Sequence, residues 1–216
     1  ANSGLEDAEN VAWKLSLILR GDASATSLDS YEIERSAAAD ENIRASTRST
    51  DFIAPHSAQE RRMRQAILRL AKGAEFAKRM VNGGRLSTPS VYETPLSTPD
   101  TDVWAAGPRP GAQMIDAPLA AANGEPVYLT EAFRQGGGGF VLLQAGSDGG
   151  DQPGCHSIHI GETAPLRDAS GLFAKRYDAS EGAAYLLRPD GYVAARFRKP
   201  TRKTVEAAIA RASAQT

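Results

Sequence analysis

The chain opens with apolar residues that recur at steps of three and four, the period of an α-helix that buries one face. The stripe comprises Leu5, Ala8, Ala12, Leu15 and Leu19, and it is widened by Val11 and Ile18. Ser3 and Glu6 have the spacing of a capping box at a helix start, and Gly21 is suited to a helix end. We therefore predict a helix from Ala1 to Gly21 with a broad apolar face.

An apolar face of this width needs a large surface to bury against, and no sequence before Ala1 supplies one. The chain also opens without a methionine. We therefore expect this sequence to be the C-terminal piece of a longer protein.

Further helical patterns follow. A second helix is predicted from a cap at Thr26 or Ser27 to about Arg48. Ser57 and Glu60 form another capping box and open a third helix, which is followed by a shorter helical piece. This whole part of the chain is therefore predicted to be helical.

The composition changes over residues 85–113. Prolines recur there with intervening serines and threonines, which argues against a helix or a central strand. We predict an extended linker that lies on a surface and is held by Val91, Tyr92 and Trp104. Plain disorder is the alternative, but the aromatic residues favour docking.

The last part of the chain, residues 114–216, alternates short strands and helices. The predicted strands are 140–143, 157–160 and a hairpin of 184–187 with 192–197, and the predicted helices are 130–134, 172–177 and one capped by Thr201. This order of elements is typical of a small α/β domain with a mixed sheet.

The composition narrows the class of protein. With 41% hydrophobic residues, 24% charged residues and a net charge of −1, the chain suits a globular protein and offers no basic patch for nucleic acid. Its single cysteine, Cys155, excludes an internal disulfide and fits a reducing, cytoplasmic location. No apolar run is long enough to span a membrane.

Three motifs carry a family resemblance. Residues 2–15 read N-S-G-L-E-D-A-E-N-V-A-W-K-L, residues 28–35 read L-D-S-Y-E-I-E-R, and residues 187–194 read L-R-P-D-G-Y-V-A. The first two resemble the N-x-G-x-x-D-A-x-N-L-x-W-K-L and L-x-x-Y-E-x-E-R motifs of FAD-dependent aromatic hydroxylases of the phenol and 3-hydroxyphenylpropionate hydroxylase type. The third resembles a motif of the thioredoxin-like domain that ends many of these enzymes.

The resemblance implies an α/β protein in three parts. Residues 1–84 would be the helical C-terminal segment of an FAD-binding domain, 85–113 a Pro-rich linker, and 114–216 a small thioredoxin-like domain that lacks the C-x-x-C motif. The expected partners are the missing N-terminal FAD-binding portion, a small aromatic substrate and a second copy in a homodimer. Nucleic acid and membrane are not expected partners.

The resemblance also implies an activity, the hydroxylation of a phenolic or aromatic substrate with NAD(P)H and O2 and with FAD as cofactor. The backbone of Ala1, Asn2 and Ser3, at the positive end of the first helix, would contact the flavin ring. The alternative is that these residues only cap the helix. No catalytic acid or base is assigned, because those positions lie mostly upstream in relatives, and the chain alone is expected to be inactive.

The other candidate sites in the sequence do not indicate a cofactor, metal or redox function. The chain has no G-x-G-x-x-G fingerprint, and its Gly136–Gly139 run precedes a strand, which indicates a turn. Glu32 and Arg35 have the spacing of a local ion pair on a helix. Three scattered histidines do not make a metal site, and Cys155 lacks the partner cysteine that thiol redox chemistry requires. A non-catalytic thioredoxin-like module for interaction or dimerisation is the second hypothesis for the chain.

Overall fold

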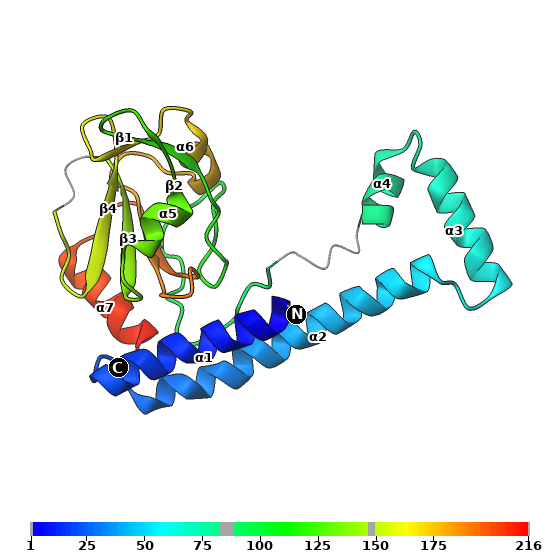
Figure 1. Ribbon diagram of the computed structural model, residues 1–216, viewed down its shortest axis with the longest axis horizontal. Coiled ribbons are helices and arrows are strands. Elements are labelled where there is room, and N and C mark those ends of the chain that lie inside the picture. The colour runs from blue at the N-terminus through cyan, green and yellow to red at the C-terminus, as the bar shows by residue number, and fades with distance from the viewer. Residues whose placement is uncertain (1, 83–88, 147–149, 216) are drawn as a thin grey trace. The chain divides into compact units, whose positions relative to one another are not determined.

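A computed structural model describes residues 2–82, 89–146 and 150–215 (Figure 1). Its described helices are α1 (Asn2–Arg20), the 3-10 helix η1 (Ala25–Leu28), α2 (Asp29–Ile53), α3 (Ala58–Leu70), α4 (Glu75–Asn82), α5 (Leu129–Arg134), α6 (Leu172–Tyr177) and α7 (Arg202–Ala212). Its described strands are β1 (Pro118–Ala121), β2 (Pro126–Tyr128), β3 (Phe140–Ala145), β4 (Cys155–Ile160), β5 (Leu166–Arg167), β6 (Ala184–Leu187) and β7 (Val193–Phe197).

Contacts group the chain into two compact units. The first unit combines Ala1–Arg35 with Val91–Thr216, and the second is Ser36–Ser90. The domain boundaries after residues 84 and 113 stay a prediction, because this grouping by contacts does not test where a domain begins in the parent protein.

The first unit is built on one mixed sheet in the order β2-β1-β5-β4-β3-β6-β7. Strands β3, β4 and β5 run parallel, whereas β6 and β7 form an antiparallel hairpin beside β3. The predicted α/β fold with a mixed sheet is confirmed, and the predicted strands and helices of this part all appear with small shifts at their ends.

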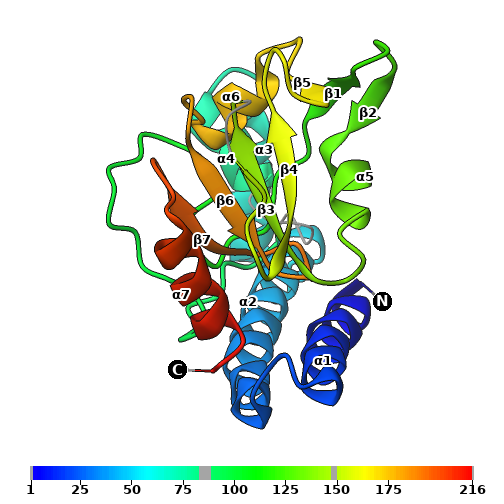
Figure 2. The same cartoon turned by 90° about the vertical axis from the view of Figure 1, so that its left-hand side faces the viewer.

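The two faces of this sheet bury two separate apolar clusters. Because side chains alternate along a strand, Phe140 and Leu142 of β3 enter one cluster and Val141 and Leu143 enter the other. Helix α7 and part of α1 cover the first face, and α5 and α6 cover the second (Figure 2). Both faces of the central strands are therefore buried, which explains their continuous apolar sequence.

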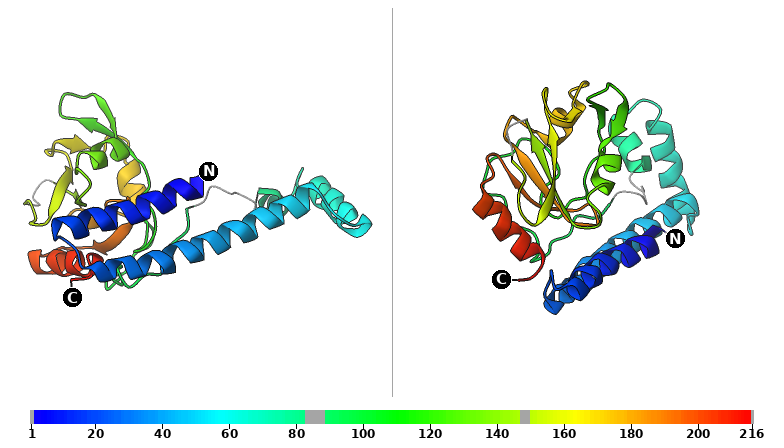
Figure 3. Two further views of the ribbon diagram at one scale, coloured as in Figure 1. Left: turned by 60° about the horizontal axis from the view of Figure 1, so that its bottom comes forward. Right: turned by 60° about the vertical axis from the view of Figure 1, so that its left-hand side comes forward.

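Helix α1 and the first turns of α2 lie side by side (Figures 1 and 3). Gly21 ends α1 with a φ of +81°, as its position predicted. The predicted capping box of Ser3 and Glu6 does not open α1, because the helix already begins at Asn2 and Ser3 lies within its first turn. The Glu6 carboxylate pairs with Arg35 of α2.

The predicted buried face of α1 is wrong for this unit. Most of the predicted stripe does not enter the core of this unit: Leu5 is 71% and Leu19 is 86% exposed, whereas Ile18 packs against the first cluster. The buried face is the opposite one, which carries Asn10, Trp13, Lys14 and Leu17. Helix α1 therefore has a mixed polar and aromatic face inside this unit and an apolar face outside it.

The second unit holds the rest of α2 together with α3 and α4. The predicted capping box of Ser57 and Glu60 opens α3 with both of its hydrogen bonds. The Arg64 side chain donates to the Ile53 carbonyl oxygen over 2.7 Å and joins the end of α2 to α3. Ile67 and Ala77 are buried in this unit.

Residues 91–112 form neither helix nor strand and belong to the first unit, whereas residues 85–88 of the predicted linker lie outside the described residues. Tyr92 is buried, and the centroid of the Trp104 ring is 4.6 Å from the guanidinium carbon of Arg196 and 3.8 Å from that of Arg198. These two of the three predicted contacts are present, whereas the third is not, since Val91 is exposed. Docking, not disorder, describes this stretch.

Candidate functional site

A group of buried polar residues joins α1, α2 and the turn between β6 and β7. We call it the Arg188 cluster, and it consists of Asn10, Trp13, Lys14, Glu34, Arg188 and Asp190. These side chains come from all three motifs that carried the family resemblance. Every one of them is less than a tenth exposed.

Arg188 is the centre of the cluster. Its Nη1 and Nη2 atoms donate to the two carboxylate oxygens of Glu34 over 2.7 and 3.1 Å. Its Nε donates to Asp190 Oδ1 over 3.0 Å, and Nη2 also pairs with Asp190 Oδ2. The guanidinium therefore bonds a carboxylate on each side, a geometry for which arginine is suited and lysine is not.

Helix α1 supplies the remaining partners. Lys14 Nζ donates to Asn10 Oδ1 over 2.7 Å and to Glu34 Oε2 over 3.2 Å. Asn10 Nδ2 donates to the same Glu34 oxygen over 2.7 Å. Trp13 Nε1 donates to Asp190 Oδ2 over 2.9 Å, which joins α1 directly to the turn after β6.

The charges of the cluster balance, with two cations facing two carboxylates. Burial alone would raise the pKa of Glu34, but the charge and hydrogen bonds of Arg188, with Lys14 and Asn10, outweigh it and lower that pKa to about 2. Burial lowers the pKa of Lys14, and Glu34 opposes that shift. Glu34 is therefore the carboxylate on which both cations depend.

A second group surrounds Arg35, the next residue along α2. Its Nε donates to Asp7 Oδ1 over 2.6 Å, and its Nη2 donates to Glu6 Oε2 over 3.2 Å and to the Ser3 carbonyl oxygen over 3.3 Å. Its Nη1 donates to the Tyr92 hydroxyl over 2.6 Å. We call these residues the Arg35 cluster; it connects the start of α1, α2 and the docked segment.

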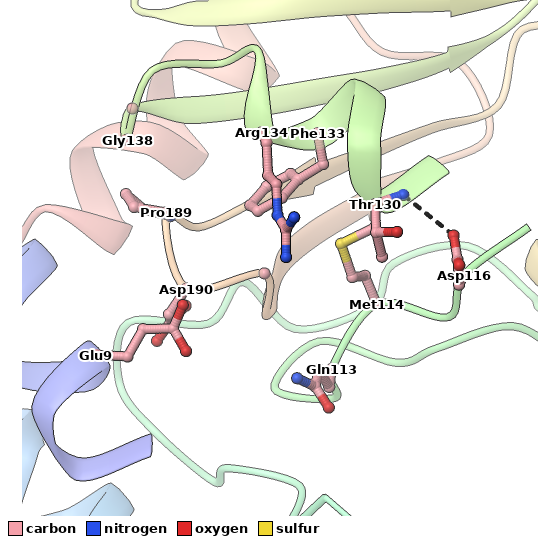
Figure 4. Close-up of a pocket in the computed structure, with 12 residues that line it drawn as sticks. Glu9, Gln113, Met114, Asp116, Thr130, Phe133, Arg134, Gly138, Pro189 and Asp190 are labelled. Atoms are coloured by element: carbon pink, nitrogen blue, oxygen red, sulfur yellow. Dashed lines mark hydrogen bonds between the residues drawn. The ribbon is translucent and has the colours of Figure 1, made fainter. Parts of the chain in front are cut away.

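A cleft of about 500 Å³ lies beside α1 (Figure 4). It is lined by Glu9 of α1, by Met114, by Arg134 of α5 and by the turn that contains Asp190. Burial and the nearby Asp190 raise the pKa of Glu9. No sequence pattern singled out this cleft, because its walls are far apart in the chain.

The predicted flavin contacts lie at the start of α1. Ala1 lies outside the described residues, Asn2 begins the helix, and Ser3 accepts a hydrogen bond from Arg35 through its carbonyl oxygen. The assignment of these residues to flavin stays a prediction. The predicted ion pair of Glu32 with Arg35 is wrong, because Glu32 is exposed and Arg35 turns toward α1.

The other sequence candidates remain without a chemical role. No group of three or more metal-ligating side chains occurs in the part of the chain that the structure describes. Burial and Asp151 raise the pKa of Cys155 to about 11, so its thiol is protonated near neutral pH. None of the described helices is long and apolar enough to cross a membrane.

Sequence reasoning missed the roles of Glu34, Arg188 and Asp190. Each was present as a motif letter, but no spacing rule connects residues that lie 154 positions apart, as Glu34 and Arg188 do. One feature of the sequence could have indicated these roles: each of the three separate motifs contains charged or aromatic residues beside apolar ones.

A family comparison places the start of the chain. Residues 1–46 match the family described as FAD binding domain. The matched segment contains α1 and most of α2, and with them both clusters' contributions from these helices.

Curated relatives extend the similarity to most of the chain. The tetracenomycin A2 monooxygenase-dioxygenase of Streptomyces glaucescens is 32% identical over 90% of this chain and 34% of its own length. A 3-(3-hydroxy-phenyl)propionate/3-hydroxycinnamic acid hydroxylase of Comamonas testosteroni is 32% identical over 53% of this chain and 20% of its own length. The chain therefore spans about a third or less of the length of these relatives.

A solved structure agrees with these relatives. Aklavinone-11 hydroxylase, in a ternary complex with FAD and aklavinone, is similar with a TM-score of 0.72 at 25% identity, over 99% of this chain and 40% of that one. The named relatives and this structure are monooxygenases or hydroxylases, and the start of the chain matches an FAD binding domain. The chain is therefore similar to part of the aromatic and polyketide hydroxylases, which confirms the resemblance predicted from the three motifs.

Proposed function

We propose that the whole protein is an FAD-dependent monooxygenase that hydroxylates a phenolic or other aromatic substrate with NAD(P)H and O2. The match of residues 1–46 to the FAD binding domain carries this proposal. Relatives named as hydroxylases and monooxygenases support the type of reaction. The non-catalytic module is not favoured, because relatives that match nine-tenths of the chain are named as enzymes.

The start of α1 fits the electron-rich edge of a flavin ring. Its first turn holds no acidic side chain, so the partial positive charge of the helix start is not cancelled there. Space beside the backbone of Gly4 is open. Glu6 and Asp7 follow in the next turn, but both are paired with Arg35. Residues 1–3 are therefore the flavin contacts that we propose.

When bound, FAD would supply the redox chemistry, taking electrons from NAD(P)H and activating O2. The backbone N–H groups at the start of α1 would hold and orient its ring. The phosphate-binding fingerprint and the catalytic acid or base belong to sequence outside this chain. We therefore propose that this chain alone neither binds FAD tightly nor turns over.

The outward stripe of α1 is the surface that we assign to the N-terminal FAD-binding portion. Leu5, Leu15 and Leu19 are exposed on a helix that matches the FAD binding domain. Apolar side chains that alternate with small alanines suit close packing against another element. A second copy of the chain is the other possible occupant, and the mass of the full-length protein in solution distinguishes the two.

The full-length protein tests the proposed function. We expect it to purify with a bound flavin, to oxidise NAD(P)H faster when a phenolic substrate is present, and to yield a product heavier by one oxygen atom. This chain expressed alone should do none of these. Full-length protein that is folded but takes up no FAD would contradict the proposal.

A further inference from the structure

Arg35 belongs to α2, yet most of its hydrogen bonds hold the first two turns of α1. Its side chain is only 5% exposed, and three of its acceptors are Asp7, Glu6 and the Ser3 carbonyl oxygen. These acceptors follow one another at helical spacing, so the planar guanidinium spans one face of the turn. The Ser3 carbonyl oxygen lies in the turn that we assign to the flavin, and Glu6 and Asp7 lie in the next turn.

The fourth acceptor connects Arg35 with the C-terminal part of the chain. Arg35 Nη1 donates to the hydroxyl of Tyr92, which is itself buried. The Tyr92 ring stacks on Tyr192, with 4.2 Å between centroids and 14° between planes. Tyr192 lies in the turn after Arg188, and the Arg188 guanidinium is 5.5 Å from both rings. A continuous series of contacts therefore runs from the β6–β7 turn to the first turn of α1.

We infer that Arg35 is a positioning residue for the flavin-facing turn, and that the thioredoxin-like domain acts on this turn through Tyr192, Tyr92 and Arg35. The inference rests on the proposed function, since it gives a role to a turn that we assign to FAD. It also gives the redox-inert thioredoxin-like domain a part in the reaction that does not require cysteines.

The charge of Arg35 gives this role a measurable consequence. Electron uptake adds negative charge to a flavin, and negative side chains nearby oppose it. Arg35 pairs with the carboxylates of Glu6 and Asp7, which lie one turn from the assigned contact. Removing Arg35 would leave two unpaired carboxylates at that place, so the flavin should become harder to reduce.

The test uses the full-length protein with Arg35→Gln, Arg35→Lys and Tyr92→Phe. Arg35→Gln removes the positive charge. Arg35→Lys keeps the charge but loses the planar guanidinium with its several N–H donors. Tyr92→Phe removes one hydroxyl group and keeps the stacked ring. Arg20→Gln is the matched control, because Arg20 forms an exposed ion pair at the other end of α1. The readouts are the reduction potential of the bound flavin and the share of oxidised NAD(P)H that yields hydroxylated product.

We expect Arg35→Gln to lower the reduction potential of the bound flavin. It should also lower, by roughly threefold or more, the share of oxidised NAD(P)H that yields hydroxylated product. Arg35→Lys should keep the potential nearer to the original and still lower the share, and Tyr92→Phe should lower the share at an unchanged melting temperature. If Arg35→Gln does not fold, Tyr92→Phe and Arg35→Lys decide the question. Arg20→Gln should change neither readout.

Two outcomes separate the inference from the function on which it rests. Variants that bind flavin and match the original protein in both readouts overturn the inference and leave the proposed function intact. Original full-length protein that folds without taking up FAD overturns both, and no measurement on a variant is then needed.

Discussion

Glu34 and Arg35 are neighbours in α2, but their side chains serve different parts of the unit. Glu34 accepts hydrogen bonds from Arg188, Lys14 and Asn10 in a buried site, whereas Arg35 donates to the start of α1. Buried ion pairs of this kind add little net stability over apolar packing, but the loss of one member leaves a buried charge unpaired. Removing one of these residues should therefore lower the unfolding free energy by more than the intact ion pair contributes to it.

The pKa of Glu34 makes a prediction about acid stability. Its folded value of about 2 lies below the ordinary value of 4.5, so its contribution is complete above pH 4.5 and is lost as pH falls toward 2. Glu34→Gln should therefore cost about 3 kcal/mol of unfolding free energy near pH 7, and this difference should shrink between pH 4.5 and 2. Urea denaturation followed by tryptophan fluorescence measures it.

Glu32→Gln is the control for this pH series. Glu32 lies on the same helix but is exposed, so its substitution should change the unfolding free energy by less than about 0.5 kcal/mol. A cost of Glu34→Gln that stays constant from pH 7 to 2 would show that the carboxylate charge is not what stabilises the cluster.

At the scale of single elements, sequence reasoning succeeded where local rules decide the outcome. The predicted helix at 172–177 is α6 without a shift, and the capping box of Ser57 opens α3 as expected. Sequence reasoning failed where contacts with residues far along the chain determine which side of an element is buried. The apolar stripe of α1 gave the wrong buried face, because the side of a helix that meets this unit depends on Glu34 and Asp190, which no helical period reveals.

Gly111 allows a close approach of two backbone segments within the docked stretch. Gly111 has a φ of +85°, and a Cβ atom there would collide with the Tyr92 carbonyl oxygen. Gly111→Ala should therefore destabilise the first unit by more than the roughly 1 kcal/mol that a positive φ alone costs. Thermal unfolding followed by tryptophan fluorescence is a suitable measurement.

Gly124 provides a matched comparison for this substitution. Its φ is also +85°, but nothing lies within 4 Å of a Cβ atom built there. Gly124→Ala should lower the unfolding free energy only by the cost of a positive φ at a residue with a Cβ atom. Equal losses for the two variants would show that the close approach to Tyr92 is unimportant.

At the scale of the molecule, this chain has two kinds of surface. The interface inside the first unit is polar and charged, and every buried charge of the Arg188 cluster has a partner. The outer face of α1 is apolar and has no covering element among the described residues. The sequence predicts a partner for this face, since a broad apolar helix needs one, and this stays a prediction. The sequence could not tell which contacts of α1 lie inside the chain.

Substitutions on the two sides of α1 should therefore behave in opposite ways. Leu15→Gln with Leu19→Gln should leave the unfolding free energy of this chain within about 0.5 kcal/mol and should reduce binding of an apolar dye. Leu17→Ala, at a side chain that is 3% exposed, should cost about 2–5 kcal/mol. Loss of stability in the Gln double variant would mean that the outer stripe is buried after all, for instance between copies.

The pairing of Glu34 with Arg188 also has a consequence in time. A ribosome makes these residues 154 positions apart, which at about 5–20 residues per second means roughly 8–30 s between them. During this interval α1 and α2 have been synthesised, but Arg188, one of the two cations that pair with Glu34, does not yet exist. A nascent chain must therefore keep this helix pair hydrated or held by another protein until its last strands emerge, and a message truncated before Arg188 should yield a product that is quickly degraded.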